Sequence, residues 1–152
     1  MDFIKKINIG SKDDCLGAEL SNFNEYHFMF NGVFCHSMEG LLQSLKFENK
    51  KEQLEVCLMV GKDAKRKGRK KNWKIEQALY WNNKKIDRHS KEYQDLIDAA
   101  FSSLFKNENF KKSLLKTKGF MLTHDIGRND PRETVLTIDE FCDRLMCLRD
   151  YY

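Results

Sequence analysis

No stretch of this sequence approaches the ~20 consecutive apolar residues that a membrane-spanning helix needs. The first ten residues also carry too little apolar content for a secretory signal peptide. Five cysteines form an odd set without Cys-x-x-C spacing, and this pattern favours reduced thiols over a framework of disulfides. We therefore expect a soluble, cytoplasmic protein that has no membrane partner.

The motifs of common nucleotide-dependent and metal-dependent enzymes are absent as well. Neither the G-x-x-x-x-G-K-[ST] loop nor the G-x-G-x-x-G turn occurs, which argues against an ordinary nucleoside triphosphate or dinucleotide enzyme. The four histidines show no H-x-x-H, H-E-x-x-H or mixed Cys and His spacing of a zinc site. We expect neither a metal ion nor a cofactor.

The apolar residues that are present suffice for one core. The chain has 152 residues, 41% of them apolar and eleven of them phenylalanine, so a single domain over residues 1–152 is expected. The formal net charge of +4 favours anionic partners such as nucleic acid, nucleotides or phosphorylated metabolites. With 27 basic residues against 23 acidic ones, this bias is mild and names no particular partner.

Hydrophobic periodicity predicts an α+β domain that is predominantly α-helical, with a small β-hairpin near the N-terminus. The hairpin signal is Asn31-Gly32, which interrupts the β-type residues of the segment 23–34. Thr137 and Glu140 have the spacing of a capping box and predict the start of the last helix. Further helices are expected over residues 37–49, 54–59, 93–105 and 110–115, and another is expected to run from the basic segment after Gly61 into residues 73–81. Turns or loops are expected over residues 82–90 and 117–132.

The segment 34–47 carries side chains that are suited to catalysis. Ser37 is a good N-cap, and an apolar stripe at helical spacing follows it at Met38, Leu41, Leu42 and Leu45. Glu39, Gln43 and Lys46 then share a polar face of the same helix. At a rise of ~1.5 Å per residue, Glu39 and Lys46 lie about 10 Å apart along the axis, where they can flank a substrate. The competing interpretation is a solvated polar face.

The segment 62–74 is strongly basic, with eight basic residues and one acidic residue. Arg66 and Arg69 can make bidentate contacts with phosphate, and the lysines around them would supply a salt-sensitive attraction to a polynucleotide. A solvated basic helix face is the alternative. Trp73 and Trp81 each offer either a ring for stacking a base or a side chain for the core.

Several blocks of sequence occur in the same order as in one protein family. They are Ser21-Asn22-Phe23, the stretch from Phe34 to Lys46-Phe47, Ala64-Lys65-Arg66-Lys67-Gly68-Arg69 with Trp81 after it, Leu114-Leu115-x-Thr117, and Leu145-Met146-x-x-Arg149. Through these blocks, about residues 20–150 resemble the NADAR, or YbiA-like, family. The sequence departs from that family at Leu122-Thr123-His124-Asp125-Ile126-Gly127, which replaces an acidic and Trp-Gly motif, at residues 82–92, which look inserted, and at Leu42, which replaces a tyrosine.

The resemblance implies hydrolysis of an N-glycosidic bond. The substrate would be ADP-ribose on guanine bases of DNA, which would pair the protein functionally with a DNA ADP-ribosyltransferase. One alternative substrate is a ribosylaminopyrimidine phosphate of riboflavin synthesis, and a second alternative is a module that binds ADP-ribose or nucleic acid without catalysis. Breaking a C1′–N bond builds positive charge on the sugar, so the site needs a carboxylate and a proton donor for the leaving nitrogen.

The resemblance also assigns the site residues. Glu39 is expected as acid or base, and Lys46 either forms an imine with the opened sugar or holds a phosphate as a charged group. Asp125, together with His124, would replace the family's missing acid. Substrate-binding residues are expected at Asn22, Phe23, Gln43, Arg66, Arg69, Trp81 and His124, and DNA phosphates would meet Lys67, Lys70 and Lys71.

Overall fold

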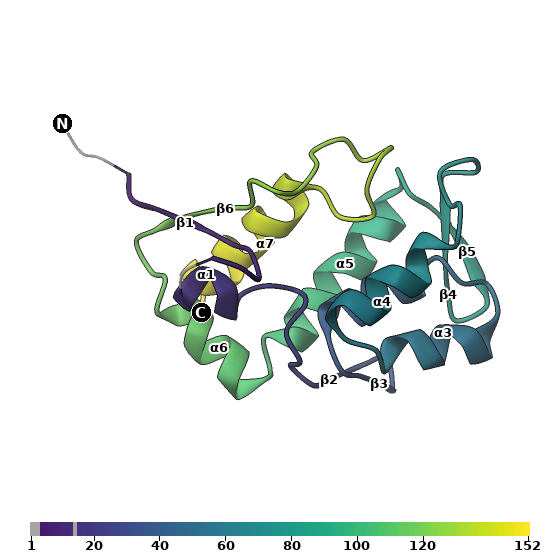
Figure 1. Ribbon diagram of the computed structural model, residues 1–152, viewed down its shortest axis with the longest axis horizontal. Coiled ribbons are helices and arrows are strands. Elements are labelled where there is room, and N and C mark those ends of the chain that lie inside the picture. Colours follow the sequence, from purple (N-terminus) through teal and green to yellow (C-terminus); the bar gives the residue numbers. More distant parts are fainter. Residues whose placement is uncertain (1–3, 14) are drawn as a thin grey trace.

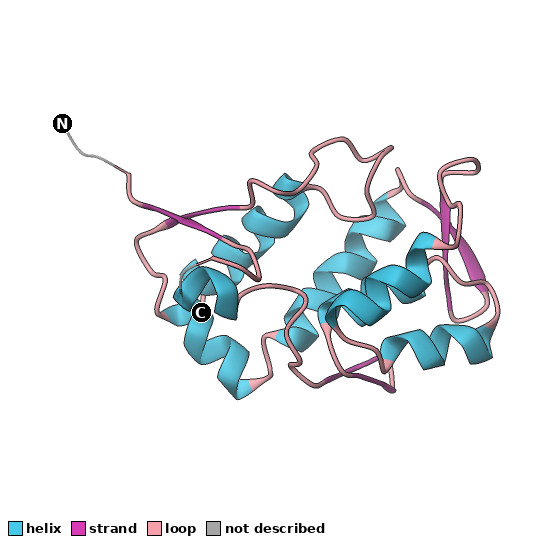
Figure 2. Cartoon of the chain, in the orientation of Figure 1, coloured by secondary structure: helices cyan, strands magenta, loops and turns pink. Residues whose placement is uncertain are grey.

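A computed structural model describes residues 4–13 and 15–152 of the chain. Over these residues the fold is α+β and mostly helical, with three separate two-stranded ladders (Figure 1). Figure 2 shows that helices form the bulk of the molecule, while the strands lie toward its periphery. In chain order the elements are β1 (Lys6–Asn8), α1 (Cys15–Glu19), β2 (Phe28–Phe30), β3 (Val33–Cys35), α2 (Met38–Ser44), α3 (Lys50–Cys57), α4 (Gly61–Arg69), β4 (Ala78–Trp81), β5 (Lys84–Asp87), α5 (Lys91–Leu104), α6 (Glu108–Leu115), β6 (Met121–Thr123) and α7 (Ile138–Asp150).

Two hairpins have asparagine at their tips. Asn31 and Gly32, with φ of 49° and 77°, form the tip of β2 and β3, so the predicted N-terminal hairpin is confirmed. The helix predicted over residues 73–81 is wrong, because β4 and β5 pair as a second antiparallel hairpin. Its tip is Asn82-Asn83, with φ of 52° and 65°, a conformation that asparagine adopts more readily than most residues. The turns predicted over residues 82–90 occur at 82–83 and 88–89, while residues 84–87 form β5.

The helix predicted over residues 37–49 is shorter than expected. It ends at residue 44, and the next helix begins at residue 50. Lys46 therefore lies in the turn after α2 rather than on the helix. The side-chain amide of Gln53, in α3, stabilises this turn through three main-chain carbonyls, those of Ser44, Phe47 and Tyr80, at 3.1, 3.2 and 2.7 Å.

The core forms around α2, α5 and α7. The capping box of α7 is confirmed, with Thr137 and Glu140 bonding each other's main-chain N–H groups. The apolar stripe of α2 is fully buried, and α4 packs directly against α2. This packing is close because α4 turns only small residues inward, namely Gly61, Ala64 and Gly68. The basic side chains of α4 are left on its outer face.

The segment predicted as a loop over residues 117–132 contains a short strand, β6, which pairs in parallel with β1. Ile7 lies opposite Leu122 in this ladder. The pairing joins segments that are more than a hundred residues apart, so no local sequence signal predicts it. It sets the chain after β6 beside the N-terminal segment.

The last two sequence blocks of the family resemblance meet in the fold. Arg149 is 4% exposed, and its guanidinium donates to the carbonyls of Thr117 and Phe120 at 2.9 and 2.7 Å. These residues close the turn after α6, so their role is structural. Among the described residues no helix has both the length and the apolar character that crossing a membrane requires.

Candidate active site

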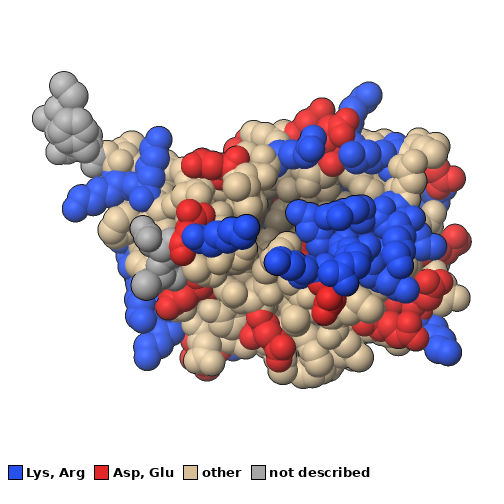
Figure 3. Space-filling view, viewed as in Figure 1, with Lys and Arg blue, Asp and Glu red and all other residues tan. Residues whose placement is uncertain are grey.

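A cleft of about 710 Å³ lies between α2, the basic helix α4 with the coil after it, and the loop from β6 to α7. Figure 3 shows Lys and Arg side chains gathered over α4 beside a hollow in the surface. A cleft of this volume suits a small-molecule ligand, and its charge favours an anion. The ionisable Lys, Arg, Asp and Glu residues that line it are Lys46, Lys65, Arg69, Lys70, Lys71, Lys74 and Arg128 against Glu39 and Glu133.

Glu39 stands in the first turn of α2, where two sequence blocks meet. Its N–H donates to the carbonyl of Asn22 at 3.0 Å. Ser37 caps the same turn, because its hydroxyl accepts the N–H of Gly40 at 2.9 Å and donates to the carbonyl of Met59 at 2.8 Å. The backbone of Glu39 is therefore fixed from both sides before any ligand binds.

The Glu39 carboxyl is partly buried at the cleft. Burial raises its pKa above the ordinary value, because the charged form loses solvation. The hydrogen bond from Gln43 and the positive charges of Lys65 and Lys46 lower the pKa, but the effect of burial is larger. Glu39 is thus held toward the protonated form that a general acid needs.

Gln43 holds the Glu39 carboxyl and depends on Gly68 to do so. Its Nε2 donates to Glu39 Oε1 at 2.8 Å, one turn earlier on α2. Its Oε1 is buried without a hydrogen-bond partner among the described residues and lies against Gly68 of α4. A Cβ at position 68 would overlap this amide oxygen. The glycine of the Ala-Lys-x-x-Gly-Arg block therefore makes room for the side chain that orients Glu39.

Lys46 lines the same cleft and is partly buried. Its pKa is lowered to about 8, mainly because burial disfavours the ammonium; Glu39 opposes this change, and the positive charges of Lys74 and Lys65 add to it. Roughly a tenth of such an amine is neutral at pH 7. The pKa values of Glu39 and Lys46 are therefore shifted in opposite directions, and each shift favours the uncharged form of its side chain.

Asn22 and Phe23 also line the cleft, as the resemblance implies. The Oδ1 atom of Asn22 is buried without a hydrogen-bond partner in the described part of the chain, so it can accept a hydrogen bond from a ligand. The Lys65 ammonium lies 5.8 Å from the centroid of the Phe23 ring. The first sequence block thus forms one wall of the cleft.

The predicted phosphate-binding residues divide into two groups. Arg69, Lys70 and Lys71 line the cleft. Arg66 and Lys67 are not among its lining residues, and the Arg66 guanidinium lies 3.7 Å from the Asp63 carboxylate with most of its side chain exposed. Lys65 and Arg128 line the cleft as well, although neither was predicted as a site residue.

The two tryptophans lie in different places. Trp73 is 8% exposed and lines the cleft, whereas Trp81 is 7% exposed and is not among the lining residues. The ring of Trp81 packs against Phe30, with centroids 5.1 Å apart. The structure thus brings Trp73, not the predicted Trp81, to the candidate site. The prediction differs because it assumed a helix over residues 73–81, whereas Trp81 lies on β4 of the second hairpin.

His124 and Asp125 both follow β6, but only one of them lines the cleft. His124 lines the cleft, and its Nδ1 lies 2.7 Å from the carbonyl oxygen of Ile9. Asp125 is exposed and is not among the lining residues, and its N–H donates to Asn8 Oδ1 at 2.8 Å. The structure therefore does not bring the Asp125 side chain to the site that was predicted for it.

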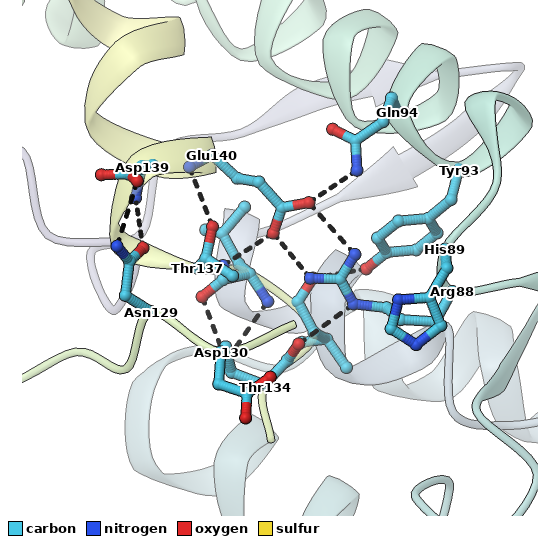
Figure 4. A network of polar contacts seen from close by, with 12 residues as sticks. Arg88, His89, Tyr93, Gln94, Asn129, Asp130, Thr134, Thr137, Asp139 and Glu140 are labelled. Atoms are coloured by element: carbon cyan, nitrogen blue, oxygen red, sulfur yellow. Dashed lines mark hydrogen bonds and ion pairs between the residues drawn. The ribbon is translucent and has the colours of Figure 1, made fainter. Parts of the chain in front are cut away.

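A buried ion pair supports the wall formed by the loop before α7 (Figure 4). Arg88 is 1% exposed and bonds the Glu140 carboxylate through both terminal nitrogens, at 3.1 and 2.6 Å. Its Nε donates to the carbonyl of Thr134, a cleft residue, at 3.0 Å. The hydroxyl of Tyr93 reaches the next carbonyl, that of Val135. The sequence signalled only the capping role of Glu140, because its partner lies 52 positions away.

Residues 15–150 match the family described as bacteriophage protein GP30.3. The chain belongs to the bacteriophage GP30.3 family. It is 31% identical over 134 residues to the uncharacterized 17.1 kDa protein in the Gp30-rIII intergenic region of Enterobacteria phage T4, covering 86% of this chain and 88% of that protein. The solved structure of Escherichia coli YbiA matches with a TM-score of 0.64 and 18% identity, over 99% of this chain and 86% of that one. The predicted YbiA-like fold is thus confirmed, and the family that matches by sequence is GP30.3.

In this member of the GP30.3 family, the site combines a proton donor, an amine and several positively charged side chains. Glu39 can protonate a leaving group, and Lys46 can act either as an amine or as a cation. The lysines and arginines of the two walls can hold a phosphorylated ligand between them. Among the described residues no cluster of His, Cys, Asp and Glu could hold a metal ion.

Proposed function

We propose that this GP30.3 family protein hydrolyses N-glycosidic bonds and removes ADP-ribose from modified guanine bases in DNA. The observation that carries the proposal is the opposite displacement of the Glu39 and Lys46 pKa values inside one cation-lined cleft. Paired perturbations of this kind are typical of sites that transfer protons or form covalent intermediates. The YbiA-like fold is consistent with this activity, and the family resemblance of the sequence blocks supplies the substrate class.

The chemistry needs a proton on the leaving nitrogen. When the C1′–N bond breaks, the electron pair moves to that nitrogen, and Glu39 in its protonated form can neutralise it. The resulting carboxylate then lies near a sugar that carries positive charge, as in glycoside hydrolysis. Lys46 has two roles open to it, attack on C1′ of the opened sugar as a neutral amine or attraction of a phosphate as an ammonium.

The cations of the cleft fit a diphosphate better than a single phosphate group. Lys65 and Arg69 come from α4, and Arg128 comes from the loop between β6 and α7, while Lys74 is paired with Glu133 at 2.9 Å. Two walls of positive charge can grip both phosphates of ADP-ribose. A ribosylaminopyrimidine phosphate carries only one phosphate, so this distribution favours ADP-ribose over the riboflavin-pathway alternative.

The test is mass spectrometry of an oligodeoxynucleotide that carries one ADP-ribosylated guanine, before and after incubation with the protein. We expect the strand to return to its unmodified mass and free ADP-ribose to accumulate. Glu39→Gln keeps the shape of the side chain and should abolish the conversion. Glu48→Gln, a matched change at an exposed residue outside the cleft, should leave it intact.

Two other outcomes would replace the proposal. Cleavage of a ribosylaminopyrimidine phosphate, with the modified DNA left intact, would assign the riboflavin-type substrate. Saturable binding of ADP-ribose without cleavage of either substrate would assign a binding module.

A further inference from the structure

His124 is held by contacts on three sides of its ring. Its Nδ1 lies 2.7 Å from the carbonyl oxygen of Ile9, which the parallel pairing of β1 and β6 sets beside it. The Phe141 ring meets it edge to face, with centroids 5.3 Å apart. Gly127 lies against the opposite edge, where a Cβ would come within 2.5 Å of His124 Cδ2 and 3.2 Å of Nε2. The ring therefore has one orientation.

The contact with Ile9 fixes the tautomer. A carbonyl oxygen only accepts hydrogen bonds, so Nδ1 must carry the hydrogen. In the neutral ring, Nε2 is then left with a lone pair. No group within residues 4–13 and 15–152 bonds to Nε2, and the side chain lines the cleft. His124 thus brings a hydrogen-bond acceptor that has no partner among the described residues to the cleft that Glu39 also lines.

We propose that His124 Nε2 is the general base that activates the attacking water, a role that rests on the proposed glycosidase function. Glu39 and His124 then divide the proton transfers, with Glu39 as the acid and His124 as the base. Asp125 is exposed and does not line the cleft, and the cleft carboxylate of this loop, Glu133, is already paired with Lys74 at 2.9 Å. The general base is then the side chain of a histidine, whereas the family resemblance led us to expect an acidic residue, Asp125, in the catalytic role.

In direct hydrolysis a C–O bond at C1′ replaces the C1′–N bond. The C1′–N bond breaks, and the leaving nitrogen takes the proton of the Glu39 carboxyl. The water oxygen forms the new bond to C1′, and the water gives a proton to His124 Nε2. The products are DNA that carries an unmodified guanine and ADP-ribose with a C1′ hydroxyl. Exchange with solvent returns the proton from His124 and restores the proton on Glu39.

The competing interpretation is that His124 only anchors the end of β6 to the N-terminal segment. His124→Asn separates the two roles, because its amide can still donate to the Ile9 carbonyl from the place of Nδ1 but has no atom in the place of Nε2. We expect His124→Asn to keep the melting temperature of the wild type. Its kcat on ADP-ribosylated DNA should fall by about 10²-fold with KM nearly unchanged. Imidazole added to His124→Ala should restore part of the missing activity.

A first measurement does not depend on activity. Nitrogen-15 NMR of the neutral histidines of the wild-type protein should assign the hydrogen of His124 to Nδ1, and a hydrogen on Nε2 would overturn the proposal. Wild-type kcat in His124→Asn, with the wild-type enzyme active, would overturn the role of His124 alone. Absence of turnover by the wild type on every N-glycoside tested would overturn the glycosidase function and the role of His124 with it.

Discussion

Gln43 Nε2 and Glu39 Oε1 form a hydrogen bond of 2.8 Å across one turn of α2. This bond favours the charged carboxylate and partly offsets the effect of burial on the pKa of Glu39. The other end of the Gln43 amide fills the space that Gly68 leaves on α4. The contact between the two helices thus reaches the candidate acid through one side chain.

Gly68→Ala should therefore impair catalysis through Gln43. The new Cβ would displace the amide, and the displaced Glu39 carboxyl should cost on the order of 10- to 100-fold in kcat/KM. In a Gln43→Ala background the same substitution meets only the Cβ of residue 43, at 3.0 Å, instead of the amide, and should cost less than about 2-fold further, as coupled sites require. Steady-state kinetics of the four proteins measures this coupling. Equal losses from Gly68→Ala in both backgrounds would show that position 68 acts on packing instead.

Glu39→Gln should lower activity and raise stability at neutral pH. The folded pKa of Glu39 lies above its ordinary value of 4.5, so its contribution to stability is complete below pH 4.5 and is lost as the pH rises through the folded pKa. Glutamine stays neutral throughout. The melting temperatures of the two proteins should coincide in acid and separate in favour of Glu39→Gln at pH 7, while activity falls by at least ~10²-fold. A lower melting temperature for Glu39→Gln at pH 7 would contradict the predicted burial effect, and the exposed Glu48→Gln should show no such trend.

Trp73 and Trp81 form a matched pair for testing which ring meets the ligand. Both are more than nine-tenths buried, but only Trp73 lines the cleft. Changing each to Phe keeps an aromatic core residue, so stability should fall by a similar amount in both. Titration calorimetry with ADP-ribose should show weaker binding for Trp73→Phe alone, by less than the ~1 to 3 kcal/mol that alanine substitution of a stacking ring costs, because phenylalanine still stacks. Weaker binding for Trp81→Phe alone would restore the prediction made from sequence.

The local features of the fold were predictable because their signals are local. Ser37, Asn31-Gly32 and the pair Thr137 and Glu140 act within four residues of themselves, so the cap, the hairpin tip and the capping box were all predicted. Glu39, Gln43 and Lys46 were placed together by helical spacing, and all three line one cleft even though the helix ends before Lys46.

The features that were missed depend on contacts between distant segments. Gln53 ties the turn after α2 to the carbonyl of Tyr80, 27 positions away. Arg88 supports the cleft wall through Glu140, and β1 meets β6 across most of the chain. The second hairpin is a different case. Its tip, Asn82-Asn83, gave a local signal, but the aromatic residues before it were interpreted as helical.

Lys70 and Lys71 should contribute more to DNA binding than the outward pair Arg66 and Lys67. Only Lys70 and Lys71 line the cleft, so Lys70→Gln with Lys71→Gln should weaken DNA binding and lower the slope of its salt dependence by about one unit for each phosphate that the variant no longer neutralises. Arg66→Gln with Lys67→Gln removes the same net charge and should have a smaller effect. Fluorescence anisotropy over a series of salt concentrations compares the two double variants. Identical reductions in affinity would mean that net charge, rather than the cleft, governs binding.

Lys46→Arg should decide between the two roles of Lys46. Arginine keeps the positive charge but cannot form an imine, so activity that survives in Lys46→Arg excludes the imine route and leaves attraction of a phosphate. If the imine forms, the rate should rise with pH toward about 8 as the Lys46 amine loses its proton, and Lys46→Arg should be inactive at every pH. Borohydride added during turnover should then trap a covalent adduct on the wild type, which mass spectrometry would locate at Lys46.

The control is Lys65→Arg, because Lys65 is a cleft lysine with no expected covalent role, and this variant should trap the adduct as the wild type does. An adduct that forms equally in Lys46→Arg would assign the attacking amine to another lysine, and no adduct in any protein would leave direct hydrolysis with Lys46 as a charged group.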